Sequence, residues 1–296
     1  MSIADSFKLL CLNLSIHPDV VEIIQYRYQR ITKTINLEYR GINSSTQHSL
    51  YVGSYGRDTE INTSDIDVLV ILPFSVYDRF NKYSTNGQSA LLQEVKEAVR
   101  KTYSITHLRA DGQVIVLHFE DSIIYEIVPC FLNKDNESFT YPDTHDGGSW
   151  KVTNPRAEIK AVNDANISCN KNLKRLCRML RAWKSTNKVD ICGLLIDTLA
   201  HNFLSQYEWR NKSYLWYDWI SRDCFKYLMD QDTNQLYWRA VGSGQHVWRT
   251  GKFENKAKAA YEHSLAAIAA YSNGQYWAAT KEWREIYGNK FPAIQS

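Results

Sequence analysis

The stretch from Gly53 to Leu72 constrains this chain more than any other. It opens with a Gly-Ser-Tyr-Gly turn, reaches Asp65 and Asp67, and then enters an apolar run rich in β-branched residues. A run of this kind predicts a buried strand. Residues two apart on a strand point to the same side. We therefore expect Asp65 and Asp67 to present two carboxylates together at the start of a buried strand.

The glycine end of the same stretch predicts a phosphate cradle. Residues 49–52 favour a short strand, after which Gly53 and Gly56 let the backbone turn and come close to a ligand. Backbone N–H groups in such a turn, together with the Ser54 hydroxyl, suit a phosphate. Two carboxylates suit Mg²⁺, which keeps waters and shares its shell with substrate phosphates. A triphosphate site and a metal site are thus expected eleven residues apart, from Ser54 to Asp65.

Each half of this pattern is common by itself. A Gly-Ser pair is usually only a turn, and Asp-x-Asp is usually the solvated edge of a loop. The two halves together, with strand patterns on both sides, favour the functional interpretation. The combination resembles the signature of the DNA-polymerase-β-like nucleotidyltransferases.

A further acid, Glu126, lies inside the apolar strand predicted for residues 123–131. An acid in such a place is costly unless it is paired or bound to a metal. One interpretation is an exposed edge-strand residue or a salt bridge. The other is a third carboxylate that meets Asp65 and Asp67 across adjacent strands. A third carboxylate lets a second metal bind and helps to deprotonate an attacking hydroxyl.

The length and composition predict two lobes. The chain has 296 residues, enough for one large or two modest domains, and all nine Trp lie at Trp150 or later. We expect a catalytic lobe with a long first helix over residues 1–150, a helical lobe over residues 151–296, and an active site in the cleft between them.

Charge and cysteine content exclude several classes of protein. A formal net charge of +3 suits anionic small molecules but predicts no strong DNA or RNA footprint. The six cysteines lack zinc spacing, which favours reduced, mostly buried thiols. No signal-peptide pattern and no run of eighteen apolar residues is found, so we expect a cytoplasmic protein without a membrane segment.

The periodicity of apolar residues predicts the remaining elements. A long amphipathic helix is expected from His17 to just before Gly41, and residues 132–155 are expected to form a polar hinge without regular structure. Further helices are predicted at 86–103, 154–163, 172–183, 192–204, 214–230, 254–271 and 275–287, and strands at 49–52, 68–72, 113–119 and 123–131.

The order of these features resembles one bacterial branch of the superfamily, the cyclic-oligonucleotide synthases called CD-NTases, relatives of cyclic GMP-AMP synthase. The resemblance covers nearly the whole chain. It is carried by the long first helix, Gly53-Ser54-Tyr55-Gly56-Arg57-Asp58-Thr59, Asp65-Ile66-Asp67, Glu126-Ile127-Val128-Pro129, Asn154-Pro155 and the helix from Arg178 to Trp183. It implies an α+β fold: a polymerase-β-like lobe with a mixed sheet, followed by a helical lobe like that of oligoadenylate synthetase.

The resemblance also implies a reaction and its participants. The enzyme would join ribonucleoside triphosphates, ATP among them, into a cyclic di- or trinucleotide without a template. Two Mg²⁺ ions, with Mn²⁺ as the alternative, would bind Asp65, Asp67 and Glu126. The expected setting is antiphage (CBASS) signalling in the bacterial cytoplasm. The diffusible product would reach an effector protein, and a regulatory protein is a further expected partner of the enzyme.

Nucleotide contacts are implied at several positions, some of which depart from the family pattern. The family commonly has Asp at the third acid, where this chain has Glu126. In the helical lobe it usually has Lys where this chain has Arg181, with Lys184 nearby, and commonly Ser where this chain has Cys192. The nucleotide contacts that the resemblance implies are Gly53, Ser54, Gly56, Arg57, Arg181, Lys184 and Cys192. Tyr214 and Trp216 are candidates to stack on bases, although packing alone also explains them.

Two alternatives stay open. The first is the same chemistry used to add a tail to RNA or to modify a small molecule or a protein, against which the weak basic charge argues. The second is a catalytically impaired nucleotide-binding relative, suggested by Glu126 in place of Asp. The intact Gly-Ser turn and the two aspartates argue against it.

Overall fold

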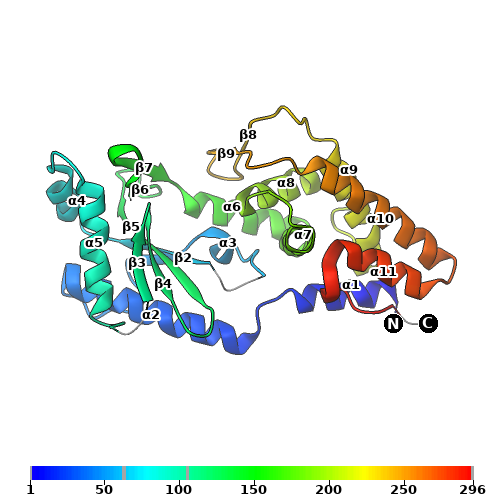
Figure 1. The fold of residues 1–296 in the computed structure, drawn as a ribbon, viewed down its shortest axis with the longest axis horizontal. Coiled ribbons are helices and arrows are strands. Elements are labelled where there is room, and N and C mark those ends of the chain that lie inside the picture. The colour runs from blue at the N-terminus through cyan, green and yellow to red at the C-terminus, as the bar shows by residue number, and fades with distance from the viewer. Residues whose placement is uncertain (1, 62–64, 105–106, 295–296) are drawn as a thin grey trace. The chain divides into compact units, whose positions relative to one another are not determined.

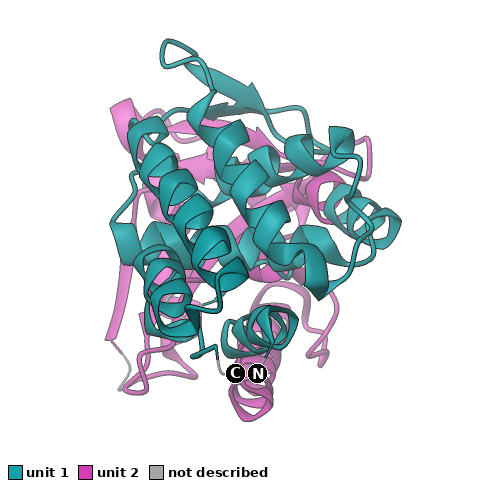
Figure 2. Ribbon diagram, turned by 90° about the vertical axis from the view of Figure 1, so that its right-hand side faces the viewer, with its two compact units in different colours: residues 1–15, 58–61, 160–296 teal, residues 16–57, 62–159 magenta. Residues whose placement is uncertain are grey.

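The computed structural model describes residues 2–61, 65–104 and 107–294, which form two compact units (Figures 1 and 2). We call residues 16–57 and 62–159 the sheet unit, and residues 1–15, 58–61 and 160–296 the helical unit. The α+β class expected from the sequence is confirmed. The division does not fall at residues 150 and 151, because the chain contributes three separate segments to the helical unit.

The sheet unit is built on seven strands among its described residues. They are β1 (Ser49–Tyr51), β2 (Ile66–Ile71), β3 (His107–Asp111), β4 (Val114–His118), β5 (Ile124–Leu132), β6 (Phe139–Asp143) and β7 (Ser149–Thr153). The order β1-β2-β5-β4-β3 is continued by β6, which pairs with the end of β5, and by β7. Strands β2 and β5 are parallel, and the other neighbours are antiparallel, so the predicted mixed sheet is confirmed.

Helices cover one face of this sheet. They are α2 (Pro18–Arg40), α4 (Phe74–Asn81) and α5 (Gly87–Arg100). A single helical turn, α3 (Gly53–Gly56), follows β1 in the connection to β2. Figure 1 shows α2 and α5 beside the strands. Val68 of β2 packs in one fully buried cluster with Ile31 of α2 and Val95 of α5. The alternate residues of β2, which include Asp67, point to the other face.

The helical unit packs around large aromatic side chains. Trp183 and Trp283 are fully buried in its core. Its elements are α1 (Ile3–Asn13), α7 (Asn172–Asn187), α8 (Gly193–Gln206), η2 (Tyr214–Trp216), α9 (Tyr217–Met229), β8 (Tyr237–Arg239), β9 (His246–Trp248), α10 (Glu254–Ser272), α11 (Tyr276–Tyr287) and η3 (Gly288–Lys290). Helix α6 (Pro155–Ser168) begins in the sheet unit and ends in the helical unit.

The long helix that ends before Gly41 is confirmed as α2, together with the signals that begin and end it, but the shorter helix α1 precedes it. His17 is the residue before α2 and accepts the Asp19 N–H, while Pro18 occupies the first helical position. Gly41 closes the helix in the left-handed conformation, at φ 65°. Leu37, which lies off the apolar stripe, is 47% exposed. The other helices and strands predicted from periodicity are also present, within a few residues of the expected bounds.

The prediction for residues 132–155 is wrong. These residues contain β6, a short turn η1 (His145–Gly147) and β7, so the expected hinge is a hairpin that extends the sheet. The predicted boundary at residue 150 falls inside β7. Short strands that are half exposed on both faces carry little periodicity, and cross-strand pairing rather than local pattern stabilises them.

Two general expectations concern membranes and thiols. Within the described ranges, no helix is long and apolar enough to cross a membrane. All six cysteines lie in those ranges and are free thiols, five of them buried and Cys192 partly exposed.

Candidate active site

Asp67 and Glu126 are neighbours in the sheet. Asp67 of β2 pairs in register with Glu126 of β5, and the two strands run parallel. Side chains opposite each other on neighbouring strands point to the same face. Both are partly exposed, whereas Val68, the next residue of β2, is fully buried. The register therefore places Glu126 on the strand next to Asp67, and its role as a third carboxylate stays a prediction.

Gly53 lies directly against the Asp67 carboxylate. A Cβ built on Gly53 would stand 1.8 Å from Asp67 Oδ2, so no other residue fits without displacing that carboxylate. Gly53 also has φ 61°, in the left-handed region that favours glycine. The Val52 N–H donates to the Asp67 backbone oxygen at 2.9 Å. Gly53 and Asp67 are thus in direct contact, and the adjoining backbone is held by a hydrogen bond.

Gly56 is required by a second close approach. A Cβ at this position would lie 2.6 Å from the backbone oxygen of Tyr51. The Gly56 N–H donates to Val52 at 2.8 Å, and the Arg57 N–H donates to Gly53 at 3.2 Å. The segment therefore folds as one tight helical turn directly after β1. Ser54 lies inside this turn.

Electrostatics at Glu126 are unfavourable in the protein alone. Burial raises the pKa of Glu126, and the charge of Asp65 raises it further. Asp111 adds to the effect, while Arg109 opposes it. An acid whose neighbours are acids is stabilised by a nearby cation.

The three predicted carboxylates do not form a closed ligand set. In the part of the chain that the structure describes, no group of three or more His, Cys, Asp or Glu side chains is arranged to hold a metal ion. Asp65 is exposed just before β2, whereas Asp67 rests on Gly53. Like-charged carboxylates repel each other. The roles of Asp65, Asp67 and Glu126 stay predictions.

Arg57, a predicted nucleotide contact, is buried in an ion pair. Its Nη1 lies 3.3 Å from Glu158 Oε2, at the start of α6, and both side chains are buried. In this arrangement the guanidinium ties the turn after β1 to α6 within the sheet unit. A direct contact with a nucleotide stays a prediction.

The next four residues, 58–61, belong to the helical unit. Asp58 pairs with Lys174 at 3.1 Å and with Arg178, both on α7. Thr59 is fully buried and donates from Oγ1 to Asp197 Oδ2 of α8 at 3.0 Å. The stretch between the phosphate turn and the aspartates is therefore anchored to helices that lie more than a hundred residues later in the chain.

Arg181, the predicted triphosphate contact, is held by the same aspartate. Its Nη1 and Nη2 lie 2.5 Å and 3.0 Å from the two oxygens of Asp197, and Nη2 also donates to the Gly193 backbone oxygen. Burial alone would lower the pKa of Arg181, but the Asp197 carboxylate more than offsets this and raises it. The structure places Arg181 in a buried, bidentate ion pair, so a direct contact with a triphosphate stays a prediction.

Lys184 and Cys192 flank this pair. Lys184 is partly exposed on α7, and its Nζ makes no ion pair with the residues described in the structure. Cys192 precedes α8 and makes no side-chain hydrogen bond to the helix end. A thiol is a weak hydrogen-bond acceptor, so a serine would cap this helix better. Both side chains are partly exposed.

Tyr214 and Trp216 lie at the other end of α7. They form η2, where Arg175 stands 4.9 Å over the Tyr214 ring and Trp216 packs against Trp209 at 5.1 Å. Asn172, the first residue of α7, fixes this loop by donating to backbone oxygens. Nine helical positions, about 13 Å, separate Asn172 from Arg181. The structure thus does not bring the two aromatic residues to Arg181.

Sequence reasoning missed Thr59 and Asp197, although one signal pointed to the aspartate. Asp197 stands in the apolar run 192–204, and an acid in such a run needs a partner. The same argument singled out Glu126. Arg181, on the preceding predicted helix, was the available cation.

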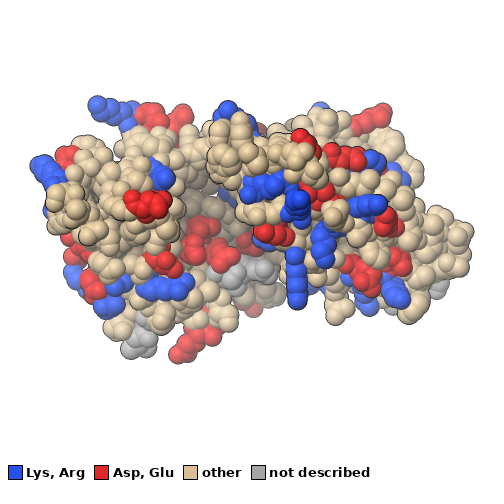
Figure 3. Space-filling view, turned by 45° about the horizontal axis from the view of Figure 1, so that its top comes forward, with Lys and Arg blue, Asp and Glu red and all other residues tan. Residues whose placement is uncertain are grey.

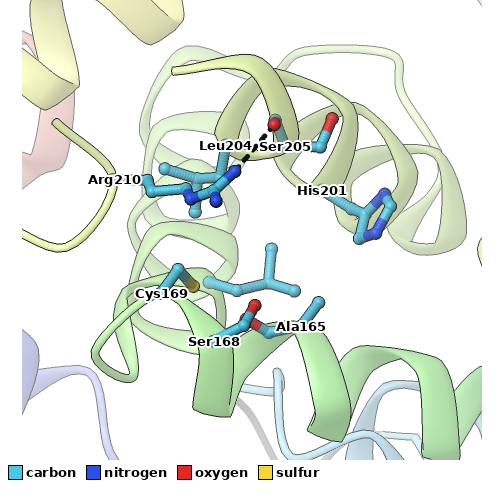
Figure 4. Close-up of a pocket in the computed structure, with 8 residues that line it drawn as sticks. Ala165, Ser168, Cys169, His201, Leu204, Ser205 and Arg210 are labelled. Atoms are coloured by element: carbon cyan, nitrogen blue, oxygen red, sulfur yellow. Dashed lines mark hydrogen bonds between the residues drawn. The ribbon is translucent and has the colours of Figure 1, made fainter. Parts of the chain in front are cut away.

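A small cavity in the helical unit contains none of the predicted residues. It has a volume of about 140 Å³ and is lined by residues from α6, α7, α8 and the following loop (Figure 4). Arg210 lies at its edge and donates to the Ser205 backbone oxygen at 2.9 Å. Sites for drug-sized ligands are usually larger, about 300–1,000 Å³. We therefore do not assign it to a nucleotide.

Basic side chains are scattered on the face shown in Figure 3. Lys and Arg form separate groups, with Asp and Glu between them. A protein that follows a polynucleotide backbone usually presents a continuous basic track.

Comparison with protein families gives a direct match. Residues 1–166 match a family described as SMODS, the Second Messenger Oligonucleotide or Dinucleotide Synthetase domain. A probable cyclic nucleotide synthase of Bacillus cereus (strain VD146) is 23% identical over 275 residues, which cover 81% of each chain.

Solved structures share the fold. CdnC of E. coli MS115-1, determined with ATP, matches with a TM-score of 0.71 and 14% identity over 98% of each chain. The same protein in a complex with HORMA-deltaN matches with a TM-score of 0.67 and 12% identity over 94% of each chain. These likenesses confirm the fold expected from the sequence.

Proposed function

The chain belongs to the family of second messenger oligonucleotide or dinucleotide synthetases, and from this premise we propose how its own residues carry out the reaction. The protein is a nucleotidyltransferase that joins nucleoside triphosphates into a cyclic oligonucleotide. We propose Asp65, Asp67 and Glu126 as its catalytic carboxylates. The register of Asp67 with Glu126, beside the Gly53 turn, is the observation that supports this most directly.

We propose that divalent metal ions bind at these residues when substrate is present. Carboxylate oxygens are the ligands that Mg²⁺ prefers, and the raised pKa of Glu126 marks a place where a cation lowers the energy. Two Mg²⁺ ions, or Mn²⁺ in their place, would be held by Asp65, Asp67 and Glu126. When bound, they would neutralise the charge that develops on the transferred phosphoryl group and the leaving pyrophosphate.

The chain's own groups bind and orient the donor. The Gly53–Gly56 turn and the Ser54 hydroxyl hold the β- and γ-phosphates. Lys184 and Cys192 are proposed as further nucleotide contacts. Arg57 and Arg181 act mainly as positioning residues, because each is paired with a buried acid. Tyr214 and Trp216 are the weakest candidates, because their loop packs at the far end of α7.

Bond formation follows from this arrangement. A ribose hydroxyl of the acceptor attacks the α-phosphorus of the donor, and pyrophosphate leaves with the electrons of the broken P–O bond. A Glu126 carboxylate oxygen accepts the proton of the attacking hydroxyl. One such addition, or two for a trinucleotide, gives the linear intermediate. A final attack within that intermediate closes the ring and releases the last pyrophosphate.

We place this enzyme in bacterial antiphage (CBASS) signalling, in the cytoplasm, with a cyclic di- or trinucleotide as the product. The relatives are bacterial, and one was determined with ATP, which supports ATP as a substrate. That relative also forms a complex with HORMA-deltaN, which supports a search for a regulatory partner protein. The product would reach its effector protein by diffusion.

The test is incubation of the purified protein with all four ribonucleoside triphosphates and Mg²⁺, followed by phosphatase treatment and mass spectrometry. We expect a phosphatase-resistant cyclic product that contains adenine. The same assay on Asp65→Asn should give none, whereas Asp78→Asn, an exposed acid on α4, should behave as the parent. Linear or RNA-attached products would instead favour the tailing alternative, and turnover by Asp65→Asn would remove Asp65 from the mechanism.

A further inference from the structure

The sheet unit contains a second, larger cavity at the opposite end of the strands that carry the acids. Its volume is about 490 Å³, and it is lined by Arg40, His48, Arg156, Phe74, Phe131 and Leu132 among others. We call it the basic cavity. Asp67 and Glu126 lie near the beginning of β2 and β5, whereas the basic cavity is lined by residues at their ends. In open sheets of parallel strands, ligands commonly bind outside the carboxyl ends.

The two arginines of the basic cavity are not neutralised by the protein. Arg40 donates from Nη2 to the Ile71 backbone oxygen at 3.1 Å, and Arg156 donates from Nη1 to the Asn136 backbone oxygen at 3.0 Å. Within the described ranges, neither guanidinium forms an ion pair with a carboxylate. A guanidinium carries five N–H donors, so most of them remain available to an acceptor.

His48 lines the cavity beside Arg40. Burial, followed by the Arg40 charge, lowers the pKa of His48 from its usual value of 6.5. The imidazole is therefore neutral at pH 7 and adds a hydrogen-bonding group without a charge. Its backbone oxygen accepts from the Ile71 N–H at 2.7 Å, which fixes the residue against the end of β2.

The rest of the wall is apolar. Phe131 is buried, but Phe74 is 62% exposed and Leu132 is 37% exposed beside the two cations. A bare inorganic ion would leave these surfaces in water, whereas a ligand with an apolar body would cover them. The volume is in the range of small-molecule sites, about 300–1,000 Å³.

We propose that the basic cavity binds a small organic oxyanion, a phosphate or carboxylate with an apolar body. Arg40 and Arg156 would bind the oxyanion, and Phe74 and Leu132 would cover the body. This site goes beyond the synthetase reaction, because its residues are not those assigned to catalysis.

The test uses simple probes on the full-length protein. Phenyl phosphate and benzoate represent the two oxyanions, and phenol is the uncharged control. Each is titrated by calorimetry in the presence of a saturating non-hydrolysable ATP analogue and Mg²⁺, which keep the catalytic site occupied. Parent protein is compared with the double variant Arg40→Gln/Arg156→Gln.

A matched control removes two positive charges from elsewhere on the same unit. Lys33→Gln/Lys82→Gln changes two exposed lysines, on α2 and directly after α4, that do not line the cavity. We expect at least about tenfold weaker binding of the better oxyanion to the arginine variant, because two charge-assisted hydrogen bonds are lost. Binding to the lysine variant should stay within about twofold of the parent, and phenol should not bind.

The proposal is overturned if the parent binds neither oxyanion saturably, or if the arginine and lysine variants bind equally well. The oxyanion that binds more tightly identifies the headgroup. If the double variant unfolds early, Arg156→Gln alone gives the same comparison, because Arg156 is exposed. Nucleotide turnover by the arginine variant should match the parent, so a failure here is distinguishable from a failure of the proposed reaction.

Discussion

Asp197 in the helical unit and Glu126 in the sheet unit are both carboxylates placed among apolar residues, but their surroundings differ. Asp197 is fully buried and accepts from two nitrogens of Arg181 and from Thr59. Glu126 is half-buried, and the neighbouring charge that affects it most is another acid, Asp65. The first arrangement is complete as it stands. The second becomes favourable only when a cation joins it, which is what a metal-dependent site requires.

The largest expected effect is on turnover. Asp67→Asn should lower the rate of product formation by about 10³-fold or more, because a metal ligand contributes several kcal/mol to the transition state. Its free energy of unfolding should hardly change, since the amide has the shape of the carboxylate. The assay is steady-state release of pyrophosphate, with urea unfolding alongside. Loss of folding together with activity would show that Asp67 serves the structure, as Asp197 does.

The second effect is on stability. Arg181→Met should lower the free energy of unfolding by about 3–5 kcal/mol, because it leaves Asp197 charged, buried and without its arginine. Arg178→Met is the matched control, since its partner Asp58 is exposed and such pairs contribute only about 0–1 kcal/mol. Urea unfolding measures both. Equal losses would mean that burial does not distinguish these two ion pairs.

The third effect concerns the packing of the phosphate turn. Gly53→Ala should be destabilising by about 1–3 kcal/mol more than Gly41→Ala. Both glycines have positive φ, at 61° and 65°, so both variants carry the same backbone strain. Only Gly53 has a neighbour in the way, the Asp67 carboxylate, whereas Gly41 faces open space. Similar losses in urea unfolding would show that the Asp67 side chain moves aside freely.

The smallest effect has the opposite sign. Because burial and Asp65 raise the pKa of Glu126, the ionised side chain destabilises the metal-free fold as the pH rises through that pKa. Glu126→Gln should therefore slightly raise the melting temperature at pH 7 in a chelator, and it should reduce the stabilisation that added Mg²⁺ brings. Val128→Thr serves as the control, because it changes a partly exposed side chain two positions further along β5. A lower melting temperature for Glu126→Gln would show that Glu126 stabilises the fold, as Asp197 does.

Local patterns predicted much of the sheet unit. The apolar run after Asp67 became β2, and Glu126, the acid in the apolar strand predicted at 123–131, became the neighbour of Asp67. The two glycines of the turn occupy positions that no side chain fits. These features depend on residues close in sequence, or on strands whose apolar pattern is strong. The hairpin over residues 139–153 was missed because its strands are short and their pairing is not a local property.

The partners of the arginines were beyond local patterns. The family resemblance predicts nucleotide contacts at Arg181 and Cys192, but the structure shows that Arg181 is bound to Asp197 and that Thr59 joins the same group. The sequence pattern puts Tyr214 and Trp216 in one predicted helix, and it does not indicate that Asn172 holds the loop before them by a hydrogen bond. Each of these contacts joins residues that are distant in sequence.

The sequence by itself determined which residues are candidates for the chemistry: the glycine turn, the two aspartates and the third acid. Backbone freedom and carboxylate oxygens are properties of the residues themselves. Only the tertiary structure decided which charges meet. Whether an arginine faces a carboxylate, as at Asp197, or a carbonyl in a cavity, as at Arg40, depends on the packing of elements far apart in the chain. That packing follows from the burial of whole helix and strand faces, which no single motif encodes.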